Sequence, residues 1–360
     1  MHAVSARTDA ELVVVAAGSH LVSPALTLRD VQAEFPIFDS VPMQVAGRVG
    51  RFEDAESLAR GVGRFARVFQ RAEPDWIVVL GDRIEAFAAG AAASVGGWAL
   101  AHIHGGDRAE GIADEAMRHA ISKLAHLHFA ATEKSRERLV RMGEEPSRVH
   151  IVGSPAIDGL AGVPELSEAR FAEWGAPAIV LLTHPVGRSD EHEEAAATEL
   201  VTASLQAAGG TNVLWLFPNL DPGRHGIARA MALAAGREKR IKTAEHLGRA
   251  EFVGLLKRLA RTGGVLVGNS SAGLIEAAAL RVPVVDVGPR QRGRERPGHA
   301  VHVDAERADE IARAIAAART LDLRELPHPY GDGRAGARIA ELLSRTNPRV
   351  PGFLRKICAY

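Results

Sequence analysis

The sequence predicts an α/β protein with two halves, each built from parallel strands that alternate with helices. Short apolar runs, typical of strands buried on both faces, recur between longer segments with helical periodicity. These runs end in loops rich in Gly, Asp, His and Ser, at the strand ends where open α/β sheets gather their ligands. The alternation stops in a stretch rich in Gly, Pro and acidic residues at 156–177 and then begins again, which places a hinge there.

Composition narrows the class of protein. The chain has 360 residues, long for a single hydrophobic core, so two domains are expected. Its 44 Lys and Arg residues balance 44 Asp and Glu residues, which argues against a general nucleic-acid or acidic-membrane binder. Cys358 is the sole cysteine, which excludes a disulfide framework and a cysteine-based metal site. The apolar run 12–18 is too short to span a membrane and lacks the basic flank of a signal peptide, so a cytoplasmic protein is expected.

The first half reads as alternating strands and helices. The expected strands are 11–17, 75–80, 98–104, 127–132 and 149–153, and the expected helices are 53–71, 86–95, 114–124 and 133–142. Only residues 1–10 precede the first strand, enough for the tail of a helix, whereas a doubly wound sheet usually opens with a strand close to the N-terminus.

The second half repeats the pattern. Its expected strands are 178–183, 212–217, 265–268 and the β-branched run near 284–287, and its expected helices are 190–208, 227–235, 251–259, one beginning near Leu274, 305–320 and 333–343. We therefore expect an N-terminal domain over 1–160, a C-terminal domain over 161–345 and a basic tail over 346–360.

Acidic residues follow neighbouring strands of the first half. Asp82 and Asp107 come directly after strands, and Asp114 and Glu115 open the next helix. Clustered carboxylates shift one another's pKa and can divide acid and base roles between them. The alternatives are structural: Asp82 as a helix N-cap, and acidic residues of a first helical turn that favour the helix dipole. At this spacing, Asp114 and Arg118 are expected to form a helix-stabilising ion pair.

The second half carries a candidate phosphate site in residues 268–273, a small-residue loop between a strand and a helix. Ser270 and Ser271 lie just before the expected helix N-terminus, where free N–H groups attract anions. Glu276 is placed to reach ribose hydroxyls. Three arginines on the loop after the next strand are suited to phosphate oxygens: Arg290, Arg292 and Arg294. The alternative is an ordinary turn with a serine cap and a solvated basic loop.

His184 ends the first strand of the second half, and a lone histidine there is more often a capped or surface residue than a catalyst. With carboxylates in one half and a phosphate loop in the other, the sequence predicts one bipartite site in a cleft between the halves.

Together these motifs strongly resemble the UDP-N-acetylglucosamine 2-epimerases. The resemblance rests on Gly81-Asp82-Arg83-x-Glu85, the run 102–132, Thr183-His184-Pro185, Pro218-Asn219-x-Asp221-x-Gly223, and the runs 268–277, 288–294 and 329–333. It is closest to the hydrolysing branch, which releases N-acetylmannosamine for sialic-acid synthesis, and to relatives in legionaminic-acid pathways. It implies a GT-B fold, with the nucleotide sugar between two Rossmann-like domains.

The resemblance also implies a reaction and its residues. UDP would be eliminated across C1–C2 to give 2-acetamidoglucal, and water would then add with inversion at C2. The implied catalytic residues are Asp82, Asp107, Asp114, Glu115 and His184, and the implied substrate or nucleotide ligands are Arg83, Asn219, Ser270, Ser271, Gly273, Glu276, Arg290 and Arg294. The family resemblance implies no metal or other cofactor and, by analogy, a homodimer.

Three features depart from the family pattern. The family's opening strand and its Gly-Thr-Arg-like loop have no counterpart before Glu11, Asp107 stands where a Glu is usual, and His225 stands where a lysine is frequent. The alternatives are therefore a non-hydrolysing epimerase and a truncated, inactive nucleotide-binding remnant. A glycosyltransferase is disfavoured because no acceptor-site motif is recognisable.

Overall fold

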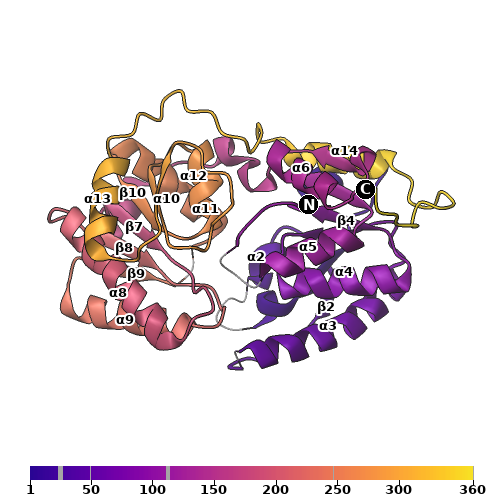
Figure 1. Cartoon of the computed structure of the whole chain (residues 1–360), viewed down its shortest axis with the longest axis horizontal. Coiled ribbons are helices and arrows are strands. Elements are labelled where there is room, and N and C mark those ends of the chain that lie inside the picture. The colour runs from indigo at the N-terminus through magenta and orange to yellow at the C-terminus, as the bar shows by residue number, and fades with distance from the viewer. Residues whose placement is uncertain (23–26, 49, 111–113, 246, 360) are drawn as a thin grey trace. The chain divides into compact units, whose positions relative to one another are not determined.

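The computed structural model describes residues 1–22, 27–48, 50–110, 114–245 and 247–359, without the side chain of Asp114. The chain divides into two compact units, each described here by itself (Figure 1). Unit 1 comprises Met1–Arg108, Ala113–Asp158 and Pro329–Tyr360, and unit 2 comprises Ala109–Ile112 and Gly159–His328.

Unit 2 is built on a parallel sheet of six strands in the order β12-β11-β10-β7-β8-β9. The strands are β7 Ile179–Leu182, β8 Val213–Leu216, β9 Ile241–Ala244, β10 Val265–Gly268, β11 Val284–Val287 and β12 Ala300–Val303. Counted along the chain this is the doubly wound order 3-2-1-4-5-6, in which the chain reverses direction across the sheet between the first and fourth strands. In this unit those strands are β7 and β10, and Leu182 pairs with Gly268 at their carboxyl ends.

Helices cover both faces of that sheet. They are α7 Glu168–Glu173, α8 Asp190–Ala207, α9 Arg224–Arg237, α10 Arg249–Thr262, α11 Ser271–Leu274, α12 Glu276–Ala279 and α13 Ala308–Ala318. Successive residues of β7 point to opposite faces: Ile179 packs in the core formed with α8, α9 and α13, and Val180 in the core formed with α7 and α10. The strands are therefore buried on both sides, which explains their continuous apolar sequence.

Unit 1 has two parallel sheets. β1 Val14–Ala17 pairs with β2 Ile37–Val41, and a second sheet contains β3 Ile77–Leu80, β4 Leu100–Ile103, β5 Leu127–Ala130 and β6 Val149–Ile151 in that order. β3 is an edge strand of its sheet, and its Val78 and Leu80 side chains are 43% and 56% exposed. Unit 1 therefore differs from a doubly wound domain, which usually has one continuous sheet.

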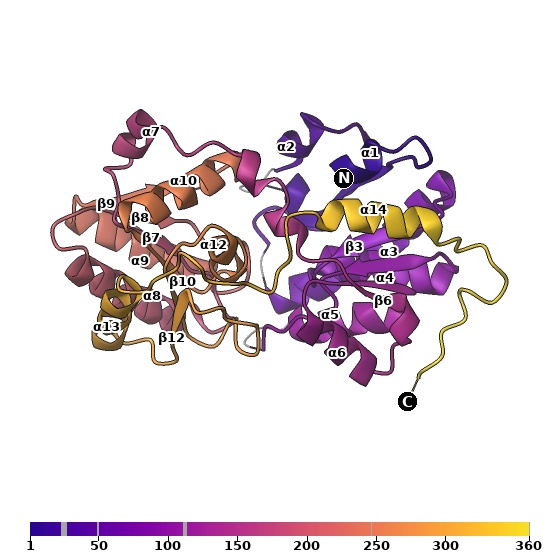
Figure 2. The same ribbon diagram turned by 90° about the horizontal axis from the view of Figure 1, so that it is seen from above.

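The helices of unit 1 are α1 His2–Ser5, α2 Leu28–Gln32, α3 Arg51–Ala72, α4 Ile84–Gly96, α5 Asp114–Leu124, α6 Glu133–Arg141 and α14 Ala335–Arg345. α3 and α4 pack their small and aromatic residues against β3 and β4, with Phe65, Phe69 and Ala92 in the shared core. α14 packs Ile339 against Leu127 and Phe129 of β5. Figure 2 shows α14 and the tail that follows it, in yellow, lying along this unit.

The structure differs from the sequence expectations in domain membership, in one helix and in several strands. Residues 329–345 were expected in the C-terminal domain, but α14 belongs to unit 1, because its apolar face packs on the sheet of that unit. The single helix expected near Leu274 is two short helices, the first beginning at Ser271. The strands β2, β9 and β12 were not predicted. Among the described residues, no helix has the length and apolar character needed to cross a bilayer.

Candidate active site

The switch point of unit 2 brings His184 beside Asn269. His184 lies two residues after β7 and Asn269 directly after β10, so the two neighbouring strands deliver both residues to the same end of the sheet. The His184 N–H donates to Asn269 Oδ1 at 2.7 Å, and Asn269 Nδ2 donates to the His184 carbonyl at 2.8 Å. Gly268 allows this approach because it has φ +147° and a Cβ there would lie 2.0 Å from the Leu182 carbonyl oxygen.

The ring of His184 is also fixed. Its Nδ1 accepts a hydrogen bond from the backbone N–H of Asn219 at 3.1 Å. A neutral imidazole that accepts at Nδ1 carries its proton at Nε2, so His184 is oriented as an Nε2–H donor. The Asn219 side chain is bonded within its own loop, where Nδ2 donates to Asp221 and Oδ1 accepts from the Asp221 N–H at 3.3 Å.

Arg290 and Gln291 converge on the same loop. Arg290 Nη1 and Gln291 Nε2 donate to the backbone carbonyl of Asn269 at 3.2 and 2.9 Å, and both residues are buried. Arg294, which follows on the same loop, is also buried. Arg292 is exposed, and its Nη2 atom lies 2.9 Å from Asp304 Oδ1. The arginine-rich loop thus directs Arg290, rather than Arg292, to the end of β10.

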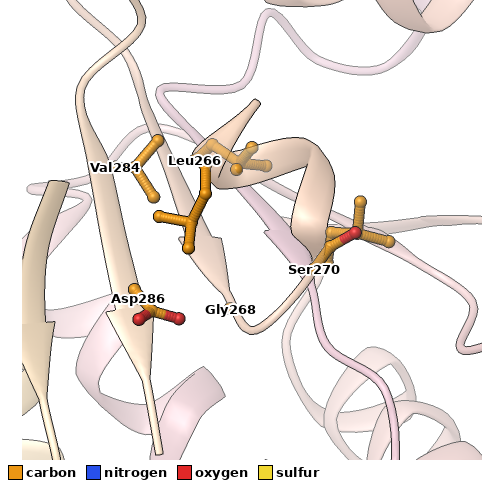
Figure 3. A pocket seen from close by; sticks show the side chains of 8 residues that line it. Leu266, Gly268, Ser270, Val284 and Asp286 are labelled. Atoms are coloured by element: carbon orange, nitrogen blue, oxygen red, sulfur yellow. The ribbon is translucent and has the colours of Figure 1, made fainter. Parts of the chain in front are cut away.

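Ser270 and Ser271 have different surroundings. Ser270 is the N-cap of α11, with its side chain accepting from the Ala272 N–H at 3.4 Å, and Ser271 is the first residue of that helix. Ser270 and Gly273 line a small pocket at the carboxyl ends of β10 and β11, together with Gly268 and Asp286 (Figure 3). The buried His299 has its Nε2 atom 2.8 Å from the Gly273 carbonyl, next to the break between α11 and α12. Because α11 and α12 each have only one turn, we expect the helix dipole to attract an anion less strongly here than at the start of a longer helix.

Glu276 begins α12, and its side chain is 14% exposed. Its Oε1 atom lies 4.0 Å from Nη1 of Arg249, so the carboxylate has a partner of opposite charge within unit 2.

In unit 1, Arg118 joins the candidate carboxylates. Its side chain is only 4% exposed, and it forms ion pairs with Asp82 and with Glu115, the latter at 3.1 Å. Asp82 follows β3 and Glu115 lies in the first turn of α5, so the guanidinium links a strand end to a helix start. Glu115 also accepts from His119 Nε2 at 3.1 Å. The expected ion pair between Asp114 and Arg118 involves the side chain of Asp114, which lies outside the described residues.

Asp107 has a different environment from Asp82 and Glu115. It is 2% exposed, and its two carboxylate oxygens are bonded to His104 Nδ1 and to the Ser135 hydroxyl, both at 2.8 Å. Arg118 Nη1 donates to the backbone carbonyl of Asp107 at 3.1 Å. The described contacts thus group Asp82 with Glu115 through Arg118 and bond the Asp107 carboxylate to His104 and Ser135.

A buried histidine connects these elements. His102 on β4 has Nε2 2.8 Å from the Gly81 carbonyl, directly before Asp82, and Nδ1 3.0 Å from the Ser122 hydroxyl of α5. Burial lowers the pKa of His102 to about 3, so the ring is neutral at physiological pH and acts as a hydrogen-bonding spacer between β3 and α5.

Arg83 is the N-cap residue of α4, and its Nε atom lies 4.0 Å from Glu85 Oε2 of the same helix. Within the described part of the chain, no cluster of His, Cys, Asp and Glu side chains has the makeup of a metal site.

The sequence analysis missed three residues that organise these sites: Arg118, Asn269 and His104. Arg118 was expected to pair with Asp114, and its ion pair with Asp82, which follows β3 and is distant in sequence, was not predicted. Asn269 and His104 lie inside the motif runs, directly after strands, and that position was the available signal for them.

The fold and these two residue groups define a class: an α/β protein of the GT-B type, with parallel sheets, a polar loop at the switch point of one unit and clustered carboxylates in the other. A family model described as UDP-N-acetylglucosamine 2-epimerase matches residues 2–344. The chain belongs to this family of sugar-nucleotide 2-epimerases, as its motifs predicted.

Individual relatives agree with this assignment. The chain is 33% identical to UDP-N,N'-diacetylbacillosamine 2-epimerase (hydrolyzing) of Legionella pneumophila, over 98% of this chain and 92% of the relative. It is 30% identical to UDP-N-acetylglucosamine 2-epimerase of Neisseria meningitidis, over 95% and 89% of the two chains. The crystal structure of the Methanocaldococcus jannaschii UDP-GlcNAc 2-epimerase in complex with UDP-GlcNAc and UDP shares the fold, with a TM-score of 0.72, 18% identity, and 93% and 99% of the two chains covered.

Proposed function

We propose that this protein is a hydrolysing 2-epimerase, which converts a UDP-linked 2-acetamido sugar and water into UDP and the free 2-epimeric sugar. The observation that carries the proposal is the 33% identity, over nearly the whole chain, to a relative named as a hydrolysing 2-epimerase. The side chains of the two units support it, because each unit supplies one of the two things the chemistry needs.

The first need is stabilisation of the departing diphosphate. The C2 proton is not adjacent to a carbonyl, so the C1–O bond to the phosphate must break ahead of proton loss, which builds negative charge on the leaving group. Unit 2 offers Ser271, Arg290 and the Nε2–H of His184 at the carboxyl ends of neighbouring strands. Oriented donors of this kind favour the charge that develops in the transition state. We assign Ser270, Gly273, Glu276, Asn219 and Arg294 to the surroundings of the bound nucleotide.

The second need is acid–base chemistry at the sugar. A base must take the proton from C2 as UDP leaves, and in the hydration step a proton must be delivered to the opposite face of C2 as water adds at C1. Asp82 and Glu115 are linked by Arg118, which fixes their carboxylates and offsets their charge. We propose that these two residues, with Asp114, act on the sugar ring, and that Asp107 positions His104 and Ser135 rather than touching substrate.

The two residue groups lie in different units, and we propose that they act on one bound molecule. Under this proposal the nucleotide belongs to unit 2 and the sugar to unit 1, with Arg83 a further candidate ligand of the substrate. We also propose a cytoplasmic location and, by analogy with the family, a homodimer; the chemistry requires no metal or redox cofactor.

The sugar carried by the nucleotide is the finer question. Relatives are named for UDP-N,N'-diacetylbacillosamine and for UDP-N-acetylglucosamine. We propose that the diacetamido sugar is the preferred substrate, because the Legionella relative has the higher identity and coverage of the two. The product would then feed the synthesis of a sialic-acid-like sugar.

The test is to incubate the protein separately with UDP-N-acetylglucosamine and UDP-N,N'-diacetylbacillosamine and to follow the products by NMR. Free UDP together with a free 2-epimeric sugar supports the hydrolysing reaction. Accumulation of a UDP-linked epimer supports the non-hydrolysing alternative instead. An intact substrate in both samples, alongside UDP binding by calorimetry, supports an inactive nucleotide-binding protein.

A further inference from the structure

The chain after α14 is attached to unit 1 by specific contacts (Figure 2). The Phe353 ring packs edge-on against Trp76 with ring centroids 5.7 Å apart, and the Arg148 guanidinium lies 4.5 Å from its centroid. Arg148 Nη1 donates to the Phe353 carbonyl at 2.9 Å, and His126 Nε2 lies 3.2 Å from the Leu354 carbonyl. These contacts place Lys356 directly beside α5.

Lys356 enters a buried charged cluster centred on Glu144, whose side chain is 3% exposed. The Glu144 carboxylate pairs with Lys356, with Lys123 at 2.7 Å and with His128 at 2.9 Å. Burial by itself would raise the pKa of Glu144, but hydrogen bonds from His128, Lys123 and Lys356 outweigh it and lower the pKa to about 2. The carboxylate is therefore ionised and holds both lysines.

Lys356 also contacts the C-terminal end of α5. Its ammonium donates to the backbone carbonyls of Ala125 and of Ser122, the latter at 3.4 Å. The last carbonyls of a helix have no partner within the helix, and a lysine there both satisfies them and complements the helix dipole. Lys356 is thus a C-terminal cap for α5 that is supplied by a segment more than 200 residues away in sequence.

The opposite end of α5 carries Glu115 and Arg118, which contact Asp82. Glu115 and Ser122 are seven residues apart, about 10 Å along a helix. Because a helix moves largely as a rigid rod, its position at Ser122 sets the position of Glu115. Ser122 is also the residue whose hydroxyl contacts His102, next to the strand end that carries Asp82.

We propose that Lys356 is a positioning residue for the candidate carboxylates: by joining the end of α5 to Glu144, it holds Glu115 and Arg118 in register with Asp82. This inference rests on the proposed function. Its effect is expected on turnover rather than on folding, because Lys123 and His128 still pair with Glu144 when Lys356 is replaced. A displacement near 1 Å lowers catalytic rates by about 100-fold in sensitive sites.

The test compares Lys356→Met and Lys356→Arg with a matched control, Arg355→Met. Arg355 is the neighbouring tail residue and is exposed. Steady-state release of UDP gives kcat and KM, calorimetry gives the stoichiometry and Kd of UDP binding, and hydrogen exchange reports on residues 116–125 of α5. For Lys356→Met we expect kcat to fall by about 10- to 100-fold, with UDP affinity and stoichiometry unchanged and with faster exchange in α5. Lys356→Arg should restore part of kcat, and Arg355→Met should resemble the wild type.

Two results would overturn the inference. One is a kcat for Lys356→Met close to that of the wild type, and the other is a loss of kcat in proportion to a loss of UDP-binding stoichiometry, which would indicate unfolding alone. If the wild-type protein does not turn over any of the nucleotide sugars, the proposed function fails. Hydrogen exchange then decides the positioning step: unchanged exchange in α5 contradicts it, and faster exchange confined to α5 supports it.

Discussion

Arg118 determines how the acidic residues of unit 1 are arranged. Two carboxylates close together repel one another unless a positive charge lies between them. The buried guanidinium of Arg118 meets that condition for Asp82 and Glu115 and also bonds to the carbonyl of Asp107. Its fixed fork of donors suits it to contacts in several directions. Arg118 thus connects β3, α5 and the loop after β4.

Asp82→Asn provides a test at the scale of one residue. The change keeps the size of the side chain but removes the negative charge and the base, so we expect kcat to fall by about 100- to 10,000-fold. The Kd for UDP should stay close to that of the wild type, because the nucleotide is assigned to unit 2. UDP-release kinetics and calorimetry give the two quantities.

Glu133→Gln is the matched control for Asp82→Asn, since Glu133 is a carboxylate of the same unit with a side chain that is 58% exposed. Its kinetics should be those of the wild type. If Asp82→Asn weakened UDP binding as much as it slowed turnover, the division of roles between the two units would be wrong.

Asp107 illustrates the limit of sequence reasoning for single residues. Its motif predicted a catalytic carboxylate like Asp82, and the sequence distinguished it only as an Asp where the family usually has Glu. The difference arises from partners brought in by other elements: His104 with φ +65° on one side and Ser135 of α6 on the other. Burial and hydrogen bonding at such a position depend on tertiary packing, which short motifs do not encode.

At the scale of the elements, we expect two neighbouring serines at the start of α11, Ser270 and Ser271, to have different roles. Ser270→Ala removes the cap of α11, and we expect unit 2 to lose about 1 kcal/mol of stability. Ser271→Ala leaves that cap intact and should weaken UDP binding by about tenfold, since a hydrogen bond to a charged group contributes about 1.5 kcal/mol or more.

Urea unfolding and calorimetry on both serine variants check this assignment, each variant serving as the control for the other. The assignment would be contradicted if Ser270→Ala weakened UDP binding more than Ser271→Ala did, while Ser271→Ala lost more stability than Ser270→Ala.

In unit 2, the central strands were predictable from the sequence and the edge strands were not. The strands β7, β8, β10 and β11 lie inside the sheet of unit 2, so both of their faces are apolar and the run is easily recognised. β9 and β12 lie at its two edges, and their sequences include Lys242 and His302. Partial exposure permits polar residues there, which removes the apolar signal. The interruption of the helix after Leu274 was not predicted either. It lies beside a contact between the Gly273 carbonyl and His299, a residue that is distant in sequence.

At the scale of the whole molecule, the sequence predicted two α/β halves but not the return of the chain to unit 1. Helical periodicity shows that α14 has an apolar face but does not say which sheet that face covers. The structure answers this question, because Ile339 lies in the same apolar core as Phe129 of β5. The same return brings the tail, and with it Lys356, to α5.

Buried histidines give the stability of the protein a defined pH dependence. Burial lowers the pKa of His102 from an ordinary value of 6.5 to about 3. Because the unfolded chain binds this proton more readily, stability is fully present above about pH 6.5 and is lost as the pH falls toward 3. One such group contributes a slope of at most about 1.4 kcal/mol per pH unit.

The variant His102→Gln measures this contribution, because glutamine retains hydrogen-bonding groups but does not titrate. Urea unfolding at about pH 7 and about pH 5 should show a smaller loss of stability in the variant than in the wild type. An equal loss in both proteins would mean that His102 is not neutral in the folded state.

The most direct test of the central claim is the fate of the C2 hydrogen. The protein is incubated in deuterated water with UDP-N,N'-diacetylbacillosamine or UDP-N-acetylglucosamine, and the released sugar is examined by proton NMR. Elimination followed by hydration predicts free UDP and a 2-epimeric sugar that carries deuterium at C2. Free sugar that retains its original C2 hydrogen, or a substrate that releases no UDP, would contradict the account.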